Sequence, residues 1–525
     1  MLWQCAALLE SAARSGKELI VTDYVRRILD TRVYDVAVRT PLDPMVRLGA
    51  RLDCPVLLKR EDLQPVFSFK IRGAYNRISQ LSPEQRAAGV ICASAGNHAQ
   101  GVALSAQRLG IKATIVMPVT TPPIKVDAVR YWGGNAILVG DTFDEAAAHA
   151  RQLEQEGGLT FVHPYDDPDV IAGQGTIGME ILQQHPDPIE AVFVPIGGGG
   201  LAAGVASFIK FLRPETKVIG VEPADAASMK AAIAAGERVI LDRVGLFADG
   251  VAVRQAGVET FRICRELLDD IILADTDEMC AAIKDIFEDT RVLAEPAGAL
   301  ALAGLKSYVA ANPTRTGALI AINSGANLNF DRLRHVAERA EIGEAREILL
   351  GVTIPEQPGS YRRFIQTIGN HTITEFNYRY ADAAEANVFV GLKLNNVSDK
   401  KAALIAELRA LGYKVLDVSA DETAKLHIRY MVGGRAPPAL RDEVILRFEF
   451  PERPGALLKF LDQMGPAWNI TLFHYRNHGA DYGRVLVGIE VPAADRPRLT
   501  ERLASLGYPY EDETSNPVYR MFLNG

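Results

Sequence analysis

Cysteine is scarce in this sequence, and its five residues are scattered along the 525-residue chain. Their number is odd and none belongs to a C-x-x-C pair, so the sequence predicts neither a disulfide framework nor a thiolate zinc site. We expect no metal centre and reduced thiols, as in a cytoplasmic protein. The five are Cys5, Cys54, Cys92, Cys264 and Cys280.

Long basic runs are absent too, and the formal net charge is -8. Nucleic acids and anionic membranes bind basic surfaces, so neither is the expected partner. The apolar stretch at residues 2–20 is broken by Glu10 and Arg14 and has no charged segment before it. It predicts neither a signal peptide nor a membrane span, which leaves small-molecule chemistry as the working hypothesis.

The chain does contain a regular alternation of short apolar runs and longer amphipathic ones. Its length predicts more than one domain, and apolar strands separated by helices are typical of a parallel sheet covered on both faces. We therefore predict a two-lobed α/β domain over residues 1–340. The strand and helix pairs are GVICAS with NHAQGVALSAQRLG, KATIVMP with PIKVDAVRYWG, AILVG with TFDEAAAHARQLEQEG, and AVFVPI with LAAGVASFIKFL.

The rest of the chain contains an internal duplication. The segment TIPEQPGSYRRFIQTIGN at 353–370 recurs as EFPERPGALLKFLDQMGP at 449–466. Two further segments recur in the same order, each about 95 residues later. Each copy reads strand, helix, strand, strand, helix, strand, the ferredoxin-like α+β order. We predict modules at 346–420 and 442–514, after a boundary in the charged segment 331–348.

One lysine stands in an unusual setting. In PVFSFKIRGAYN, residues 65–76, Lys70 follows two phenylalanines and precedes Arg72 by two positions. Lys70 can lay its stem on the aromatic rings with its ammonium in water, or it can bind a phosphate as a point charge. It can also be a desolvated amine that attacks a carbonyl. The lysine alone does not choose among these roles.

A strand runs into a helix at SAGNHAQG, residues 94–101. The backbone N–H groups at such a helix N-terminus bind a carboxylate or a phosphate. The side-chain amide of Asn97 can donate to a ring hydroxylate, and His98 can line the site. Two alternatives stay open, because Asn97 can simply cap the helix and His98 can lie on the helix surface.

Two more segments end a strand with polar or flexible residues. In VFVPIGGGGLAAG the four glycines 197–200 are costly in chain entropy, which indicates a close approach by a phosphate, with a tight turn as the alternative. Neither a Walker lysine nor a G-x-G-x-x-G fingerprint with its acidic partner is present. In GALIAINSGANLN the strand ends at Ser324, where open α/β sheets bind ligands, although Ser324 can also be a loop cap.

These segments occur in one order: KREDLQPVFSFKIRGA, SAGNHAQGVA, GGGGLAAG, EPAGALALAG and NSGANLN. In this order they resemble the fold-type-II pyridoxal-phosphate enzymes, and among them the threonine/serine dehydratases. With the duplicated region, including LFHYRNHGADYGRV and LHIRYMVGGR, nearly the whole chain is similar to the long biosynthetic threonine deaminases. The resemblance implies a catalytic domain followed by two ACT-like regulatory modules.

The resemblance also assigns roles to the cofactor-binding residues. It makes Lys70 the lysine that condenses with the cofactor's aldehyde and Asn97 the partner of its phenolic oxygen. It makes Ser324 the residue that faces the pyridine nitrogen. The phosphate loop then consists of Gly197, Gly198, Gly199, Gly200 and Leu201.

The implied reaction deaminates L-threonine, with L-serine as an alternative substrate. A neutral hydroxyl at Ser324 cannot sustain a buried pyridinium, so the carbanion is short-lived and the β-hydroxyl is lost promptly. Lys70 takes the Cα proton, and either Lys70 or the cofactor phosphate protonates the leaving hydroxyl. Arg72 and Glu295 shape the site or form simple ion pairs. The residues expected to bind the substrate carboxylate are Ser94, Gly96, Asn97 and His98.

The duplicated region contains no catalytic set and resembles amino-acid-sensing modules. The resemblance implies inhibition by isoleucine, the end product, with valine opposing it, in a homotetramer. The helix GALLKFLDQMG supplies the expected wall of the effector pocket. Its candidates are Leu457, Leu458 and Leu461, which can equally be core residues at helical spacing.

Three rival functions are open at this point. A β-replacing enzyme such as a cysteine synthase would share Lys70, Asn97 and the glycine loop, but not the duplicated tail. A serine racemase or a degradative dehydratase typically ends before the duplication. A non-catalytic amino-acid sensor would have no need of an intact Lys70 and glycine loop.

Overall fold

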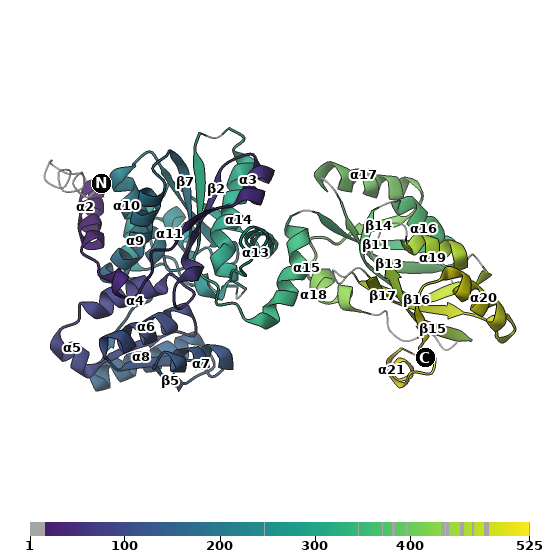
Figure 1. Cartoon of the computed structure of the whole chain (residues 1–525), viewed down its shortest axis with the longest axis horizontal. Coiled ribbons are helices and arrows are strands. Elements are labelled where there is room, and N and C mark those ends of the chain that lie inside the picture. The colour runs from purple at the N-terminus through teal and green to yellow at the C-terminus, as the bar shows by residue number, and fades with distance from the viewer. Residues whose placement is uncertain are drawn as a thin grey trace. The chain divides into compact units, whose positions relative to one another are not determined.

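The computed structural model describes residues 16–523 with several internal gaps. It divides into two compact units, Met1–Gly343 and Glu344–Gly525 (Figure 1). Cys5 and most of the apolar N-terminal stretch lie outside the described residues. The internal residues not described are 246, 315, 345, 370, 381–383, 395–396, 432–435, 437–439, 441, 452–455, 465–466 and 477–481.

The first unit contains a six-stranded sheet in the order β1-β2-β10-β7-β8-β9. All neighbours are parallel except the edge strand β1, which pairs antiparallel with β2. The predicted parallel sheet is therefore confirmed, with an antiparallel edge. The strands are β1 (Leu42–Pro44), β2 (Val56–Arg60), β7 (Ile189–Pro195), β8 (Lys217–Pro223), β9 (Asp270–Ala274) and β10 (Ala318–Asn323).

Helices cover both faces of this sheet, because its strands alternate their side chains between the two faces. On β7, Val192 and Val194 pack with α2, α9, α10 and α12, whereas Ala191 and Phe193 pack with α3, α13 and α14. The helices are α2 (Gly16–Leu29), α3 (Val46–Leu52), α9 (Pro168–Gln184), α10 (Gly200–Leu212), α11 (Ser228–Ala235), α12 (Val258–Leu267), α13 (Thr276–Thr290), α14 (Pro296–Ala311) and α15 (Leu333–Gly343).

A second lobe of this unit is built on a parallel four-stranded sheet, β5-β4-β3-β6. Two helices begin with a capping box, in which Ser82 or Thr142 exchanges hydrogen bonds with the residue three positions later. The elements are β3 (Val90–Ala93), β4 (Ala113–Met117), β5 (Asn135–Leu138), β6 (Thr160–Phe161), α4 (Lys70–Ser79), α5 (Pro83–Ala88), α6 (Asn97–Leu109), α7 (Pro123–Tyr131) and α8 (Phe143–Gly157).

Helix α4 joins the two lobes, since it packs against α6 on one side and α9 on the other. Glycines allow these close contacts. A Cβ at Gly101 would lie 3.2 Å from the carbonyl carbon of Lys70, and a Cβ at Gly73 would lie 2.3 Å from the side-chain nitrogen of Gln174. Bulkier residues would push the helices apart, so these glycines help to set the position of Lys70.

The second unit is a single antiparallel sheet of eight strands in the order β14-β11-β13-β12-β16-β17-β15-β18. Its strands are β11 (Glu347–Pro355), β12 (Thr372–Arg379), β13 (Glu385–Lys393), β14 (Lys414–Asp417), β15 (Glu443–Pro451), β16 (Asn469–Arg476), β17 (Tyr482–Glu490) and β18 (Tyr510–Asp512). Its helices are α16 (Ser360–Ile368), α17 (Val397–Ala410), α18 (Glu422–Leu426), α19 (Ala456–Met464), α20 (Arg496–Leu506) and α21 (Pro517–Phe522).

Each repeat has the predicted order of strand, helix, strand, strand, helix, strand, so the ferredoxin-like pattern is confirmed. The repeats join edge to edge through β12 and β16 and share one core, in which the rings of Phe376 and Phe473 lie 5.6 Å apart. The duplication extends to side-chain contacts, because the hydroxyl of Thr374 donates to Glu347 and that of Thr471 donates to Glu443.

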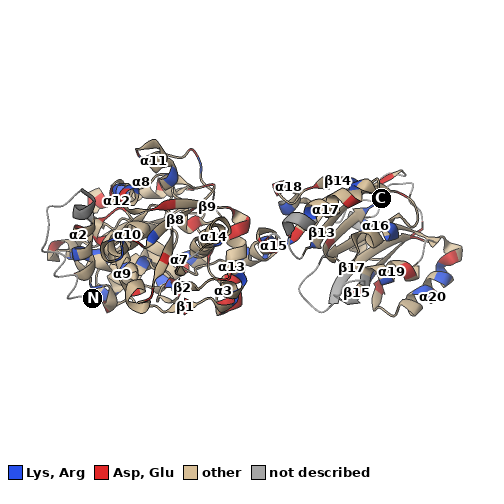
Figure 2. Cartoon of the chain, turned by 90° about the horizontal axis from the view of Figure 1, so that it is seen from above, with Lys and Arg blue, Asp and Glu red and all other residues tan. Residues whose placement is uncertain are grey.

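Acidic and basic residues are interspersed over the described parts of both units (Figure 2). None of the described helices combines the length and apolar character needed to cross a bilayer. Four cysteines fall within the described residues, and all four are free thiols: Cys54, Cys92, Cys264 and Cys280.

Candidate active site

The loop before Lys70 is fixed to the segment that follows β10. The backbone N–H of Ala326 donates to the carbonyl oxygen of Phe67 at 2.9 Å, and Ser68 forms an isolated β-bridge with Gly325. Phe67 has φ 54°, an uncommon value for an aromatic residue. These bonds bring Lys70 and Ser324 to the same place in the fold.

Lys70 is the first residue of α4, and its amine lies inside the protein. The Nζ atom donates to the carbonyl oxygen of Pro164 at 2.8 Å. Burial lowers the pKa of Lys70 to about 8, although the charge of Glu295 acts in the opposite direction. A lowered lysine pKa is the condition for a nucleophilic amine. This geometry does not fit the surface role, in which the ammonium would stand in water.

Asn97 is the first residue of α6 rather than its cap. The N-cap is Gly96, and no side chain caps this helix. The Asn97 side chain instead bonds two residues outside the helix, with Nδ2 donating to Glu295 Oε1 at 2.6 Å and Oδ1 accepting from Asn327 Nδ2 at 2.7 Å. The alternative of a capping asparagine is therefore wrong. A Cβ at Gly96 would meet no atom within 4 Å, so its α-carbon borders open space.

His98 is buried, with 4% of its surface exposed, so the helix-surface alternative is also wrong. Its Nε2 atom lies 2.8 Å from the carbonyl oxygen of Val162. Burial, together with the nearby charge of Lys70, lowers the pKa of His98 to about 3, so the ring is neutral. Ser94 accepts a hydrogen bond of 3.3 Å from the N–H of Gly96 within the same turn.

None of the four glycines in this loop has room for a side chain. A Cβ at Gly198 would lie 2.2 Å from the ring of Tyr165, and one at Gly197 would lie 3.0 Å from Val251 Cα. Gly199 has φ 96° and is the N-cap of α10, which no side chain caps. Such a helix end presents free N–H groups to an anion. The loop needs glycine both for this turn and because Tyr165 takes the space of a side chain.

Ser324 is buried at the end of β10, and its hydroxyl donates to the carbonyl oxygen of Ala297 at 3.2 Å. The neighbouring carboxyl group belongs to Glu295, which is 4% exposed. Burial and, to a smaller extent, the charge of Asp249 raise the pKa of Glu295 to about 7, although the hydrogen bond from Asn97 acts in the opposite direction. Glu295 therefore belongs to the site, beside Asn97 and Lys70.

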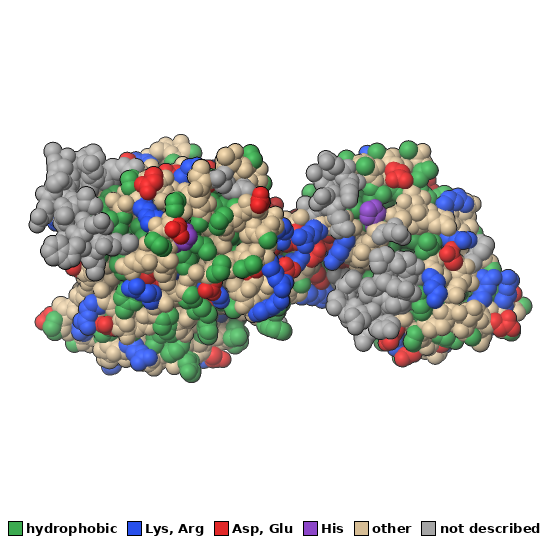
Figure 3. Space-filling view, turned by 45° about the horizontal axis from the view of Figure 1, so that its top comes forward, with side chains coloured by type: hydrophobic (Ala, Val, Ile, Leu, Met, Phe, Trp, Pro, Cys, Tyr) green, Lys and Arg blue, Asp and Glu red, His purple; other side chains and the backbone are tan. Residues whose placement is uncertain are grey.

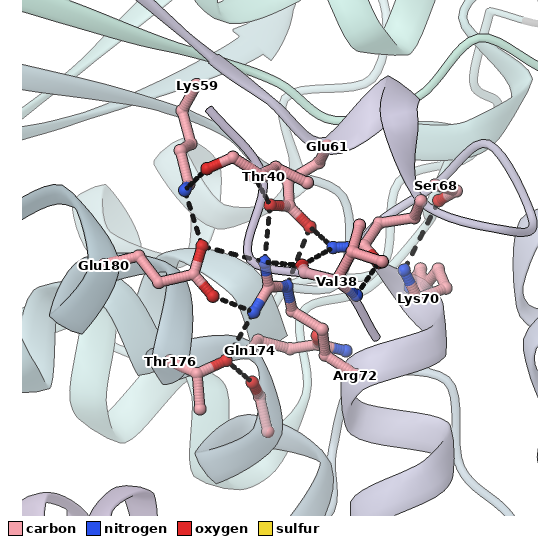
Figure 4. A network of polar contacts seen from close by, with 12 residues as sticks. Val38, Thr40, Lys59, Glu61, Ser68, Lys70, Arg72, Gln174, Thr176 and Glu180 are labelled. Carbon is pink, nitrogen blue, oxygen red and sulfur yellow. Dashed lines mark hydrogen bonds and ion pairs between the residues drawn. The ribbon is translucent and has the colours of Figure 1, made fainter. Parts of the chain in front are cut away.

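Arg72 forms ion pairs instead of facing the site (Figure 4). Its guanidinium donates to Glu61 through Nε and Nη2 at 2.8 Å each, and to Glu180 Oε1 through Nη1 at 2.6 Å. Lys59 Nζ donates to Glu180 Oε2 at 2.5 Å. All four side chains are fully buried, and their charges balance. This cluster fixes the first turn of α4 to β2 and α9.

Three contributors to the site were missed from the sequence alone. Tyr165 packs on the glycine loop, Pro164 accepts from Lys70, and Asn327 binds Asn97. Pro164 and Tyr165 lie in the run HPYD after β6, and Asn327 lies in NSGANLN. Neither run has a charge or spacing pattern that would identify a cofactor-binding residue.

The second unit contains a partly open cavity between its two repeats. It lies at the N-terminus of α16 and is closed on the other side by α19 and β16. Leu461 lines this cavity, whereas Leu457 and Leu458 are partly buried against the core of the unit. Most of the PERPGA turn of the second repeat lies outside the described residues. The other lining residues include Ile354, Glu356, Gln357, Ser360, Tyr361, Met464, Trp468, Asn469 and Ile470.

The residues of the first unit fit pyridoxal phosphate. A buried amine of lowered pKa suits its aldehyde, the uncapped N-terminus of α10 suits its phosphate, and the neutral Ser324 suits its ring nitrogen. Residues 33–325 match the family described as pyridoxal-phosphate dependent enzymes. Residues 338–428 and 434–523 match the family described as the C-terminal regulatory domain of threonine dehydratase.

Individual proteins agree with these matches. The chain is 58% identical to the L-threonine dehydratase biosynthetic IlvA of Burkholderia multivorans, over 96% of this chain and 99% of that protein. The structure of the processed form of threonine deaminase isoform 2 from Solanum lycopersicum is 50% identical, with a TM-score of 0.61, over 63% of this chain and 91% of that one.

The structure of maize serine racemase is 33% identical, with a TM-score of 0.57, over 60% of this chain and 96% of that one. The racemase therefore spans little more than half of this chain. The chain belongs to the biosynthetic threonine dehydratases, which are pyridoxal-phosphate-dependent enzymes with a C-terminal regulatory domain.

Proposed function

We propose that the protein converts L-threonine to 2-oxobutanoate and ammonia, the first step of isoleucine biosynthesis, and that it also accepts L-serine. The main support for this proposal is the buried amine of Lys70, whose pKa is lowered to about 8 and which lies near Asn97, Glu295 and Ser324. When bound, pyridoxal phosphate supplies an electron sink for the bonds at the substrate α-carbon.

Lys70 is proposed to hold the cofactor and to take the Cα proton, for which a pKa near the working pH is well suited. Asn97 is proposed to bind the phenolic oxygen and Ser324 to face the ring nitrogen. The loop from Gly197 to Leu201 is proposed to bind the phosphate at the N-terminus of α10. Lys70, once it holds the Cα proton, would be placed to protonate the leaving hydroxyl, with the cofactor phosphate as the alternative acid.

The substrate carboxylate is proposed to bind at the uncapped N-terminus of α6, where N–H groups and the helix dipole favour an anion. The open space beside the α-carbon of Gly96 supports this. The proposed contacts are those of the turn and first residues of the helix, Ser94, Gly96, Asn97 and His98. The buried, neutral ring of His98 contributes shape here rather than charge.

The test is direct. Purified protein with pyridoxal phosphate is assayed for 2-oxobutanoate from L-threonine, and borohydride reduction followed by peptide mapping locates the modified lysine. A pyridoxyl group on Lys70 together with 2-oxobutanoate formation is expected. A β-replacing enzyme would instead add a thiol to the substrate, and a silent sensor would release no 2-oxo acid.

We further propose that isoleucine inhibits the enzyme by binding in the cavity between the two repeats, and that valine competes there. Glu356 accepts hydrogen bonds from the Tyr378 hydroxyl and from Asn469 Nδ2 at 2.9 Å, which places a carboxylate where an ammonium group can bind. The hydroxyls of Ser360 and Tyr361 are buried without a partner among the described residues.

These groups suit the three parts of an aliphatic amino acid. The N-terminus of α16, which has no side-chain cap, and the Ser360 hydroxyl suit its carboxylate, and Glu356 suits its ammonium group. Leu461 and Met464 suit its apolar side chain. Deletion of residues 345–525 is expected to leave deaminase activity and abolish inhibition. Inhibition that survives the deletion would remove the sensor from the second unit.

The proposed domains are residues 1–340, 346–420 and 442–514, the first catalytic and the others regulatory. We propose a homotetramer, which the exposed apolar side chains of Ile124 and Tyr131 on α7 support. Figure 3 shows further hydrophobic side chains on the face of the first unit that it displays. We also propose a cytoplasmic location, which the free thiols support. Light scattering of the purified protein tests the assembly.

A further inference from the structure

The side chain of Asn327 is oriented by a backbone carbonyl. Its Nδ2 atom donates to the carbonyl oxygen of Val66 at 2.8 Å. A carbonyl oxygen only accepts hydrogen bonds, so the nitrogen end of this amide, and not its oxygen end, must face Val66. The orientation of Asn327 is therefore fixed by chemistry, which is rarely the case for an isolated asparagine.

This orientation is passed on to Asn97. The second N–H of Asn327 donates to Asn97 Oδ1 at 2.7 Å, so the oxygen end of Asn97 must face Asn327. The nitrogen end then faces the opposite way, where it donates to Glu295 Oε1 at 2.6 Å. An amide nitrogen has two hydrogens, and this bond uses one of them. The other N–H of Asn97 is left for a ligand.

We propose that Asn327 is a positioning residue, which holds the Asn97 amide with its remaining N–H toward the phenolic oxygen of the cofactor. This inference rests on the proposed function, because it assumes that the cofactor binds between Lys70 and Asn97. Asn327 touches neither cofactor nor substrate in this arrangement. It acts through Asn97.

The loop that carries Asn327 is well anchored for this purpose. The N–H of Glu295 donates to the carbonyl oxygen of Gly325 at 3.1 Å, and the N–H of Ala326 donates to Phe67 at 2.9 Å. A Cβ at Gly325 would lie 2.5 Å from Glu295 Oε1, so the loop and the carboxyl group are in close contact. Asn327 therefore links the Lys70 loop, Asn97 and the Glu295 helix.

Removal of Asn327 leaves only the bond to Glu295 to orient the Asn97 amide, so rotation by half a turn becomes easier and would present the amide oxygen to the cofactor. Two oxygens facing each other repel, and the phenolic oxygen would lose a donor. A structural role alone, in which Asn327 only fastens the loop to Val66, would lower stability but would not change the electronic state of the bound cofactor. The visible absorption of the cofactor distinguishes the two roles.

The experiment uses the full-length enzyme with bound pyridoxal phosphate. The variants are Asn327→Ala, Asn97→Ala and the double variant, with Asn329→Ala as a control two residues further along the same loop. The readouts are the visible absorption spectrum, kcat and KM for L-threonine, and borohydride labelling of Lys70. Should Asn327→Ala fail to fold, Asn327→Asp serves in its place, since a carboxylate cannot donate to Asn97.

Asn327→Ala is expected to shift the absorption band and lower kcat by roughly tenfold to a hundredfold, while Lys70 is still labelled. In the Asn97→Ala background the second substitution is expected to change neither the spectrum nor kcat further, because Asn327 acts through Asn97. The proposal would be overturned if the effects of Asn327→Ala and Asn97→Ala on kcat added fully in the double variant. It would also be overturned if the spectrum of Asn327→Ala matched that of the Asn329→Ala control. An inactive, unlabelled wild type would overturn the proposed function instead.

Discussion

The backbone N–H of Phe69 donates a hydrogen bond of 3.2 Å to the carbonyl oxygen of Ser324. The residue before the candidate Schiff-base lysine is thus fixed to the residue proposed to face the ring nitrogen, although the two lie far apart in the sequence. Because Lys70 starts α4 and Ser324 directly follows β10, this contact sets one helix against one strand. A small displacement of either would alter the geometry of the whole site.

The buried environment of Lys70 predicts how cofactor-free protein reacts with pyridoxal phosphate. Burial lowers the pKa of Lys70 to about 8, and only the neutral amine attacks an aldehyde. The rate of attachment, followed by absorbance, should rise with pH and level off above about 8, whereas an ordinary lysine of pKa about 10.4 would continue to gain. Lys70→Ala should give no borohydride-stable adduct. A rate that still rises steeply above about pH 9 would contradict the assignment.

The raised pKa of Glu295 predicts that the stability of the fold depends on pH. Burial raises its pKa from 4.5 to about 7, so the folded state holds a proton that the unfolded state releases between these values. The stabilisation is complete below about pH 4.5 and is lost as the pH rises through about 7. Cofactor-free wild type should therefore lose roughly 3 kcal/mol relative to Glu295→Gln between about pH 5 and 8. Urea unfolding of both proteins at both pH values checks this. The prediction fails if the difference in unfolding free energy between wild type and Glu295→Gln is the same at the two pH values.

The buried charge cluster predicts a large cost for the loss of Arg72. Arg72→Met would leave Glu61 and Glu180 buried without their main partner, which should cost roughly 3–5 kcal/mol of unfolding free energy. Arg77→Met on the same helix is the control, because Arg77 and Asp167 form a partly exposed pair at 3.0 Å. Its loss should cost about 1 kcal/mol or less. If urea denaturation shows that both variants lose the same unfolding free energy, the buried cluster stabilises the fold no more than the partly exposed pair does.

The sequence was a good guide to the fold because its signals are periodic. Continuous apolar runs marked the parallel strands, and the repeated PEQPGS and PERPGA segments marked the two modules of the second unit. The antiparallel edge strand β1 gave no such signal, since its three residues Leu42–Pro44 are too few to show a period. Short elements of this kind are decided by their tertiary partners.

Single residues of the site were harder to predict than its segments. Lys70, Asn97 and Ser324 stand at the strand and helix ends where ligands bind, so their positions follow from local patterns. The contacts made by Tyr165 and Asn327 depend on packing between distant segments. The sequence also could not distinguish Arg72, which lies in a buried ion cluster, from Glu295, which lies beside Asn97.

The contact between Gly198 and Tyr165 predicts that a side chain at position 198 will clash with the Tyr165 ring, and that shortening Tyr165 will relieve the clash. A Cβ at Gly198 would lie 2.2 Å from the Tyr165 ring, so Gly198→Ala should displace either the loop or the ring at a cost of about 1–3 kcal/mol. Affinity for pyridoxal phosphate should fall at the same time. Adding Tyr165→Ala should restore part of that affinity, measured by absorbance titration. If the double variant binds no better than Gly198→Ala alone, the clash is not what limits binding.

The cavity of the second unit predicts a variant that is active but less sensitive to isoleucine. Glu356→Gln can still contact both neighbours, with its amide oxygen accepting from Asn469 and its amide nitrogen donating to the Tyr378 hydroxyl, but it removes the charge proposed to bind the effector ammonium group. The concentration for half-inhibition should rise roughly tenfold to a hundredfold. Activity without isoleucine should not change, since Glu356 lies in the second unit. Glu449→Gln, at an exposed position on β15, is the matched control. If both variants keep the wild-type response, isoleucine does not bind through Glu356, and the cavity loses its proposed role.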